Sequence, residues 1–226
     1  MNPKQRAAEA ALKFVGNDMT VGLGTGSTAE QFLYALAAAL KAGTIRNIRG
    51  VPTSRQSELL ARKLGIPLGT LAECPHPDVT IDGADEVAPN LDLIKGLGGA
   101  LLREKIVAQN SSKLVIIADS GKSVSKLGTH CALPIEVIQF AHETQERFLR
   151  TLGTTPALRR TSDGAAFVTD NGNFIYDCRF PNGIDDAHEL ERTLKWRAGI
   201  VETGLFLGIA AVAIVADENS AQIRTR

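Results

Sequence analysis

The sequence predicts an α/β protein with a doubly wound, mostly parallel sheet domain and a smaller inserted α+β domain. Strand-like apolar segments alternate with helix-like segments as far as residue 119, as in α/β sheets. After Gly128 the order becomes β-α-β-β-α-β, the split βαβ pattern. An apolar segment at 210–217 then reads as one more buried parallel strand, which returns to the first sheet. These observations indicate a Rossmann-like sheet domain and a ferredoxin-like insertion.

In the first part of the chain, hydrophobic periodicity and turn residues define the elements. An amphipathic helix is predicted within 1–16. Strands are predicted at 19–24, 47–51, 78–85, 91–96 and 113–119, and helices at 27–43, 54–65 and 99–111. Ser27 or Thr28 is the candidate N-cap of the second helix, and Gly43 is its candidate stop.

The second part contains the elements of the insertion. Strands are predicted at 133–140, 155–160, 173–180 and 200–208, and helices at 141–153 and 184–196. We therefore expect the small domain to span 130–204. The larger domain would then be formed by 1–129 and 205–226, both within the usual range of domain sizes.

Composition restricts the class of protein. Lys+Arg and Asp+Glu are both 25, so no general affinity for nucleic acid or an anionic membrane is expected. The longest apolar run, 205–216, is shorter than the roughly 20 residues of a membrane span, and no signal peptide is evident. The three cysteines and four histidines form no metal-binding motif. We expect a cytoplasmic protein with reduced thiols and no bound metal.

The segment Gly24-Thr-Gly-Ser-Thr28 joins the first strand of the sheet to a helix. Glycines let the backbone approach an anion, and the N–H groups of a helix N-terminus can then donate to it. A plain turn with a serine cap is the simpler alternative. A dinucleotide fingerprint is another, but the third glycine comes one place early and no acid lies between Lys41 and Gln56. The segment 53–55, "TSR", could bind the 2′-phosphate of NADP, so the dinucleotide alternative is not excluded.

Three acids follow the strand at 78–85, in the segment Asp82-Gly-Ala-Asp85-Glu86. Carboxylates that lie close together raise at least one pKa, which suits acid–base catalysis. A solvated Asp-Gly turn and a Mg²⁺ site are the alternatives.

Two further loops carry lysines. Lys95 precedes Gly96-Leu-Gly-Gly at the start of a helix, where it could neutralise a phosphate or an oxyanion. Glu104 follows in that helix, and its position alone favours a surface carboxylate. Lys122 follows the strand at 113–119, and a surface role is the default for a lysine. Since ligands bind at the carboxyl ends of parallel strands, we expect all four loops at one edge of the sheet.

Taken together, the segments "VGLGTGSTA", "TIDGADEV", "KGLGGALLREK" and "IIADSGK" resemble ribose-5-phosphate isomerase of the A type. The resemblance covers nearly the whole chain and includes "PTSRQSELLARKLGIPL", "LPIEVIQF" and "VTDNGNFIYDCRF". It implies interconversion of ribose 5-phosphate and ribulose 5-phosphate in the non-oxidative pentose phosphate pathway. It also implies that no metal or organic cofactor is needed. Members of the family are usually homodimers and sometimes tetramers, so the resemblance favours a homodimer and leaves a tetramer open.

The resemblance assigns the site residues by matching motif positions. The base that transfers the proton would be Glu104, with Asp82, Asp85 and Lys95 as further catalytic residues. The substrate-binding residues would be Thr25, Gly26, Ser27, Thr28, Asp82, Gly83, Ala84, Asp85, Lys95, Gly96, Leu97, Gly98 and Lys122.

One position departs from the family pattern. The family has four glycines after the lysine, and Leu97 replaces the second of them. If that position needed a positive φ, leucine would cost about 1 kcal/mol or more. Three alternative functions stay open: a sugar-phosphate sensor, a coenzyme A transferase-like enzyme with Glu104 as nucleophile, and an NADP-dependent dehydrogenase.

Overall fold

The structure is a computed structural model that describes residues 2–226. The chain divides into two compact units. The first comprises residues up to Ala84, Arg103–Ser123 and Gly208–Arg226, and the second comprises Asp85–Leu102 and Val124–Leu207. Residues 85–102, 124–129 and 205–207 therefore group with the second unit, outside the expected span of 130–204.

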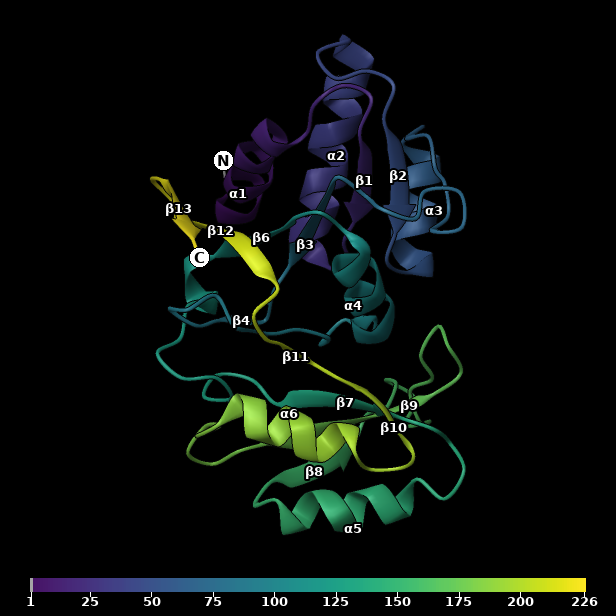
Figure 1. Ribbon diagram of the computed structural model, residues 1–226, viewed down its shortest axis with the longest axis vertical. Helices are drawn as coiled ribbons and strands as arrows, with labels where there is room; N and C mark the ends of the chain where they lie inside the picture. Colours follow the sequence, from purple (N-terminus) through teal and green to yellow (C-terminus); the bar gives the residue numbers. More distant parts are fainter. Residues whose placement is uncertain (1) are drawn as a thin grey trace. The chain divides into compact units, whose positions relative to one another are not determined.

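A six-stranded sheet forms the centre of the first unit (Figure 1). Its strands, in spatial order, are β13 (Ala221–Thr225), β12 (Ala210–Ala216), β6 (Leu114–Asp119), β3 (Val79–Gly83), β1 (Thr20–Leu23) and β2 (Arg49–Pro52). The strands from β12 to β2 are parallel, and β13 is antiparallel to β12. The predicted parallel sheet is thus confirmed, as is the return of the late apolar strand. The hairpin partner β13 was not predicted.

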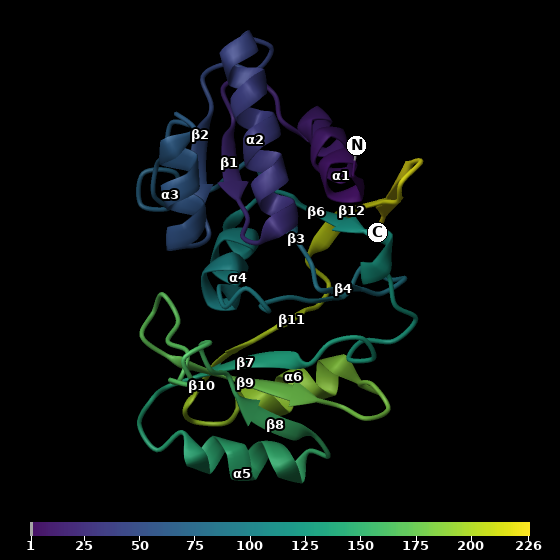
Figure 2. The ribbon, with the colours of Figure 1, turned by 180° about the vertical axis from the view of Figure 1, so that it is seen from behind.

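Helices cover this sheet. They are α1 (Pro3–Ala11), the 3₁₀ turn η1 (Leu12–Phe14), α2 (Ser27–Ala42), α3 (Arg55–Lys63), α4 (Leu101–Asn110) and the 3₁₀ turn η2 (Ser120–Lys122). Figures 1 and 2 show α2 and α4 on opposite faces of the sheet, which is the doubly wound arrangement. Asn2 caps α1 by accepting from the Gln5 N–H, and Gly43 ends α2 in the left-handed conformation.

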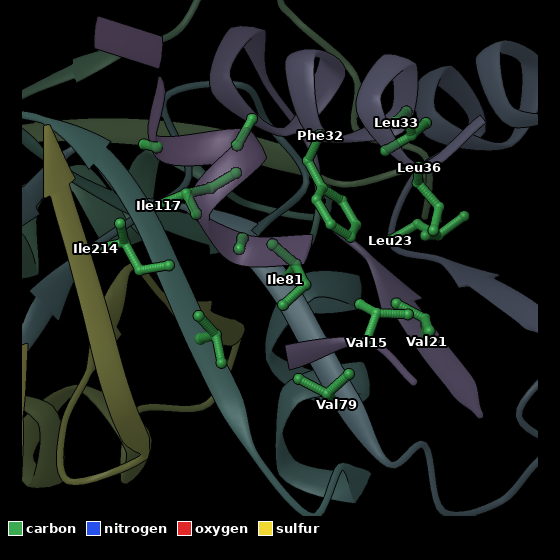
Figure 3. Close-up of a cluster of buried hydrophobic side chains, with 14 of the residues drawn as sticks. Val15, Val21, Leu23, Phe32, Leu33, Leu36, Val79, Ile81, Ile117 and Ile214 are labelled. Carbon is green, nitrogen blue, oxygen red and sulfur yellow. The ribbon is translucent and has the colours of Figure 1, made fainter. Parts of the chain in front are cut away.

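The core beneath α2 follows from its sequence. Phe32, Leu33 and Leu36 recur at helical spacing and are buried against the sheet. Figure 3 shows them facing Leu23 and Ile81, which come from neighbouring parallel strands. Burial of this apolar face fixes the start of α2, and with it the loop that precedes the helix.

The second unit contains a four-stranded sheet. Its elements, in chain order, are β7 (Leu133–Val137), α5 (Glu143–Thr151), β8 (Thr155–Leu158), β9 (Phe174–Arg179), α6 (Ala187–Lys195) and β10 (Ile200–Thr203). The spatial order is β10-β7-β9-β8, and every pair is antiparallel. Each helical crossover therefore passes over one strand, and this confirms the predicted split βαβ pattern.

A three-stranded sheet of short strands, also in the second unit, was not predicted. It contains β4 (Glu86–Val87), β5 (Leu93–Ile94) and β11 (Leu205–Phe206), in the order β11-β5-β4. The single strand expected at 200–208 is therefore two strands, separated at Gly204. A Cβ at Gly204 would lie 2.3 Å from the Lys95 carbonyl oxygen, so glycine permits the close approach.

Among residues 2–226, no helix has both the length and the apolar character required to cross a membrane.

Candidate active site

Three of the four predicted loops leave adjacent parallel strands at their carboxyl ends. The loop at 24–28 follows β1, Asp82 lies in β3, and Lys122 lies in η2 after β6. Since β6, β3 and β1 are neighbours in the sheet, these loops share one edge, as predicted (Figure 1). The fourth loop, at 95–98, follows β5 of the three-stranded sheet, so the expectation of a single strand edge for all four loops was wrong.

The loop after β1 is held by Asp82. The Asp82 side chain is buried, and its Oδ1 accepts from the Thr25 N–H at 3.0 Å and from the Gly83 N–H at 2.7 Å. A Cβ on Gly24 would lie 2.2 Å from the same oxygen, so only glycine allows this approach. One carboxylate therefore joins the ends of β1 and β3.

Thr25 directs its hydroxyl away from the loop surface into a buried cluster of hydroxyl groups. Its Oγ1 lies 2.8 Å from Thr53 Oγ1, 2.8 Å from Ser54 Oγ and 3.1 Å from Ser57 Oγ. Ser57 in turn donates to the Gly24 carbonyl at 2.6 Å. The hydroxyls of the "TSR" segment are thus bonded inside the protein. This argues against the alternative in which they bind a 2′-phosphate.

The start of α2 differs from the prediction. The N-cap is Gly26, at φ 101°, and not Ser27 or Thr28. Both residues instead lie in the first turn of the helix, where N–H groups have no intrahelical acceptor. Because neither side chain caps the helix, the turn combines backbone and hydroxyl donors, the arrangement that suits an anion.

Sequence reasoning missed Lys4. This residue lies in the first turn of α1, and its Nζ donates to Ser27 Oγ at 2.9 Å. The ammonium group therefore adds positive charge beside the N-terminus of α2. Lys4 precedes Ser27 by 23 residues and belongs to no motif, so only the packing of α1 beside α2 could have revealed it.

The three acids of the Asp82–Glu86 segment have different environments. Asp85 lies in the second unit, where its Oδ2 accepts from the Leu97 N–H at 3.0 Å. Glu86 is buried and accepts from three backbone N–H groups, those of Gly128 at 2.6 Å, His130 at 2.7 Å and Cys131 at 2.8 Å. Glu86 therefore fastens the segment before β7 and has a structural role.

The loop at 95–99 is tightly constrained. Lys95 is 2% exposed, its N–H donates to the Gly204 carbonyl, and its Nζ lies 5.3 Å from the centre of the Phe206 ring. Gly96 and Gly99 adopt φ values of 103° and 81°. Leu97 does not adopt a positive φ, so the strain considered for this substitution is absent. Its side chain is 43% exposed.

Glu104 lies in the first turn of α4 and is 3% exposed. The alternative of a surface carboxylate, which its position in the sequence favours, was therefore wrong. The next residue, Lys105, is buried as well. Lys122 is half-buried in η2, which Asp119 caps by accepting from the Gly121 N–H.

Among the described residues 2–226, no group of three or more His, Cys, Asp and Glu side chains could hold a metal ion.

Comparisons with known proteins agree on one family. The profile described as ribose 5-phosphate isomerase A (phosphoriboisomerase A) matches residues 49–220. The chain is similar to the ribose-5-phosphate isomerase A of Roseiflexus sp. (strain RS-1), with 52% identity over 213 residues that cover 94% of this chain and 91% of the relative. The corresponding protein of Bacillus mycoides (strain KBAB4) is 49% identical over 97% of both chains.

Solved structures give the same result. A D-ribose-5-phosphate isomerase in complex with phospho-erythronic acid is 41% identical, with a TM-score of 0.96 and full coverage of both chains. The ribose 5-phosphate isomerase of Plasmodium falciparum is 40% identical, with a TM-score of 0.95 over 99% of this chain and 97% of that chain. The chain therefore belongs to the ribose 5-phosphate isomerase A family.

Proposed function

We propose that this protein interconverts D-ribose 5-phosphate and D-ribulose 5-phosphate as an aldose–ketose isomerase. The observation that carries the proposal is the family membership, at about half identity over nearly the full length of this chain and its relatives. The relative that binds phospho-erythronic acid supports it further. That compound carries a carboxylate and a phosphate, and its carboxylate resembles the oxygens of an enediolate.

The proposed reaction passes through an enediolate. Glu104 removes the proton from C2 of the aldose and returns it to C1, while a second proton moves between the two oxygens. Burial of Glu104 supports this role, because an enclosed carboxylate can contact a bound substrate with little competition from water. Lys95 and the N–H groups of the following loop stabilise the negative charge on the intermediate.

Asp82 and Asp85 complete the proposed catalytic set. They handle hydroxyl protons and assist opening of the furanose ring. The two carboxylates are held by backbone N–H groups, of Thr25 and Gly83 for Asp82 and of Leu97 for Asp85. Their positions are therefore fixed before substrate binds, which lowers the reorganisation required during the reaction.

We further propose that the first turn of α2 binds the substrate through Gly26, Ser27 and Thr28, together with the Thr25 backbone. Gly83, Ala84, Gly96, Leu97, Gly98 and Lys122 complete the proposed set of substrate contacts. The position of Lys4 favours binding of the substrate phosphate at the N-terminus of α2, because the Lys4 ammonium lies 2.9 Å from Ser27 Oγ. Binding of the non-reacting phosphate would fix the sugar for proton transfer.

Formation of ribulose 5-phosphate from ribose 5-phosphate by the purified protein, assayed in EDTA, tests this function. We expect metal-independent turnover. Tight binding of ribose 5-phosphate without turnover would instead favour the sugar-phosphate sensor. Absence of both would contradict the proposed substrate.

Two finer properties are part of the same proposal. The family resemblance implies that the protein forms a homodimer. It also implies that the protein is cytoplasmic and acts in the pentose phosphate pathway. Light scattering of the purified protein tests the first, since a mass near 24.1 kDa would identify a monomer.

A further inference from the structure

The guanidinium group of Arg159 lies against the backbone of the loop at 95–99. Arg159 follows β8, and its Nη1 donates to the carbonyl oxygens of Gly96 and Leu97, each at 3.0 Å. The opposite side of the guanidinium binds the Asp177 carboxylate through Nε, at 2.9 Å, and through Nη2. The side chain is only 12% exposed. All four residues belong to the second unit.

These contacts fix the direction of two peptide groups. The chain has no cis peptide bond among its described residues, and in a trans peptide the C=O and N–H groups point in opposite directions. Because the carbonyls of Gly96 and Leu97 point to Arg159, the N–H groups of Leu97 and Gly98 point away from it. The Leu97 N–H accordingly meets Asp85 Oδ2 at 3.0 Å.

A second contact holds the guanidinium and the loop together. The Arg159 guanidinium lies 5.7 Å from the centre of the Phe167 ring, and the Phe167 N–H donates to the Arg159 carbonyl. A Cβ on Gly99 would lie 2.6 Å from Phe167 Cζ. Arg159 and Phe167 thus pack together against the loop at 95–99, on the side to which the Gly96 and Leu97 carbonyls point.

From this geometry we propose that Arg159 is a positioning residue for the isomerase reaction. It holds the Leu97 N–H on the Asp85 carboxylate and turns the Gly98 N–H away from the guanidinium, where the Gly98 N–H donates to a substrate oxygen. Asp177 in turn orients Arg159. This inference rests on the proposed function, and it concerns a residue that does not itself touch the substrate.

Arg159 suits this role better than lysine would. Its planar fork can donate to two carbonyls and one carboxylate at the same time, whereas an ammonium group has three donors and no fixed plane. The side chain of the exposed neighbour Arg160 donates to the Gly164 carbonyl of its own turn, at 2.8 Å. Arg160 therefore provides a matched control with the same change of charge.

The test compares Arg159→Ala and Arg160→Ala with the wild type in kcat, KM and affinity for phospho-erythronic acid. Because the Gly98 N–H acts most strongly on charge that develops during the reaction, and the Leu97 N–H keeps Asp85 in place, kcat of Arg159→Ala should fall by about 10- to 100-fold, with a smaller change in KM. Arg160→Ala should resemble the wild type. Added guanidinium chloride, at concentrations that leave the fold intact, should restore activity to Arg159→Ala and not to the control.

The other outcomes are also decisive. An Arg159→Ala protein with wild-type kcat and an intact circular dichroism spectrum would overturn the inference while leaving the isomerase function in place. If this variant does not fold, Arg159→Lys provides the test instead. Wild-type kcat in Arg159→Lys would show that the planar guanidinium group is not needed, and this result would overturn the inference. An inactive wild type would instead refute the proposed function, and the inference would fall with it.

Discussion

At the scale of single residues, one short segment contains acids with different tasks. Asp82, Asp85 and Glu86 lie within five positions, but they accept hydrogen bonds from different parts of the chain. Glu86 uses both oxygens to hold three backbone N–H groups. The spacing of the acids in the sequence contains no information on those long-range donors, so it could not separate the structural acid from the others.

Replacement of Glu86 by glutamine should reduce stability. The amide nitrogen cannot accept, so at least one of the N–H groups of Gly128, His130 and Cys131 would lose its acceptor, together with the favourable charge. We expect a loss of about 2 to 3 kcal/mol in the free energy of unfolding. Urea denaturation followed by circular dichroism measures this loss.

Asp85→Asn is the matched control for that prediction. Asp85 is only half-buried and accepts one backbone bond, so this change should lower the free energy of unfolding by less than about 1.5 kcal/mol. It should nevertheless remove most of the isomerase activity. Equal losses of stability in the two variants would contradict the structural role given to Glu86.

For other residues, the burial or the contacts depend on tertiary packing and could not be predicted from the sequence. The burial of Glu104 depends on how α4 packs, and its place next to Arg103 and Lys105 favours the opposite expectation. Lys4 and Arg159 reach their loops across 23 and 63 residues of sequence, respectively. No local pattern encodes such contacts, whereas the glycine loops and the Asp82–Glu86 segment are local and were found.

At the scale of elements, the loop at 95–99 depends on glycine for two separate reasons. Gly96 and Gly99 need a positive φ, and Gly99 also lies against the Phe167 ring. The second reason adds a steric clash to the backbone strain. Leu97 avoids both problems, because its φ is not positive and its side chain is partly exposed.

Gly99→Ala should therefore be more harmful than a comparable change elsewhere. Gly153 has a φ of 76° with nothing within 4 Å of its added Cβ, so Gly153→Ala measures backbone strain alone, about 1 kcal/mol. We expect Gly99→Ala to lose clearly more stability than Gly153→Ala, and to lose activity as well. Denaturation and the isomerase assay measure both effects.

A double variant identifies the cause of that difference. Phe167→Leu removes the ring atoms that would meet the new methyl group, so it should recover part of the loss in Gly99→Ala. The interaction energy of the two changes gives the size of the clash. Strict additivity of the two losses would show that Phe167 is not responsible.

Elements with strong periodicity were predictable, and short ones were not. The apolar spacing of Phe32, Leu33 and Leu36 predicts α2 correctly, because burial of that apolar face against the sheet stabilises the helix. The predicted cap of α2 was wrong, because Gly26, at a φ of 101°, is the N-cap and the helix starts only after it. β4, β5 and β11 have two residues each, too few for any period to show.

At the scale of the whole molecule, the fold class follows from the order of elements, but the edges of the sheets do not. Alternating strands and helices determine the parallel sheet through right-handed crossovers. β13 lies at an exposed edge of the sheet, and its sequence mixes polar and apolar residues. Its pairing with β12 depends on a hairpin turn, and the hydrophobic pattern of the sequence gives no sign of this strand.

Stability of the molecule should fall at alkaline pH. Burial raises the pKa of the Cys178 thiol to about 12, whereas a thiol in an unfolded chain ionises near pH 8.5. Between these values the unfolded state binds fewer protons, so the free energy of unfolding decreases as pH rises, by up to about 1.4 kcal/mol per pH unit. Tyr176, whose pKa burial raises to about 12, adds to the decrease above pH 10.

Denaturation of two cysteine variants from about pH 8 to about pH 10 tests this account. Cys178→Ala lacks the buried thiol, so its stability should decrease less steeply with pH than that of the wild type. Cys74→Ala removes a partly exposed thiol and should keep the wild-type slope. Identical slopes for all three proteins would rule out Cys178 as the source.

The central claim is that Glu104 moves the proton between the two carbons of the sugar phosphate. The most direct test is to measure kcat and phospho-erythronic acid affinity for Glu104→Gln, with the exposed Glu9→Gln as control. Loss of a general base should lower kcat by about 100-fold or more, while affinity stays within a few-fold of the wild type and the control remains fully active. A Glu104→Gln protein that retains more than about a tenth of the wild-type kcat would contradict the account.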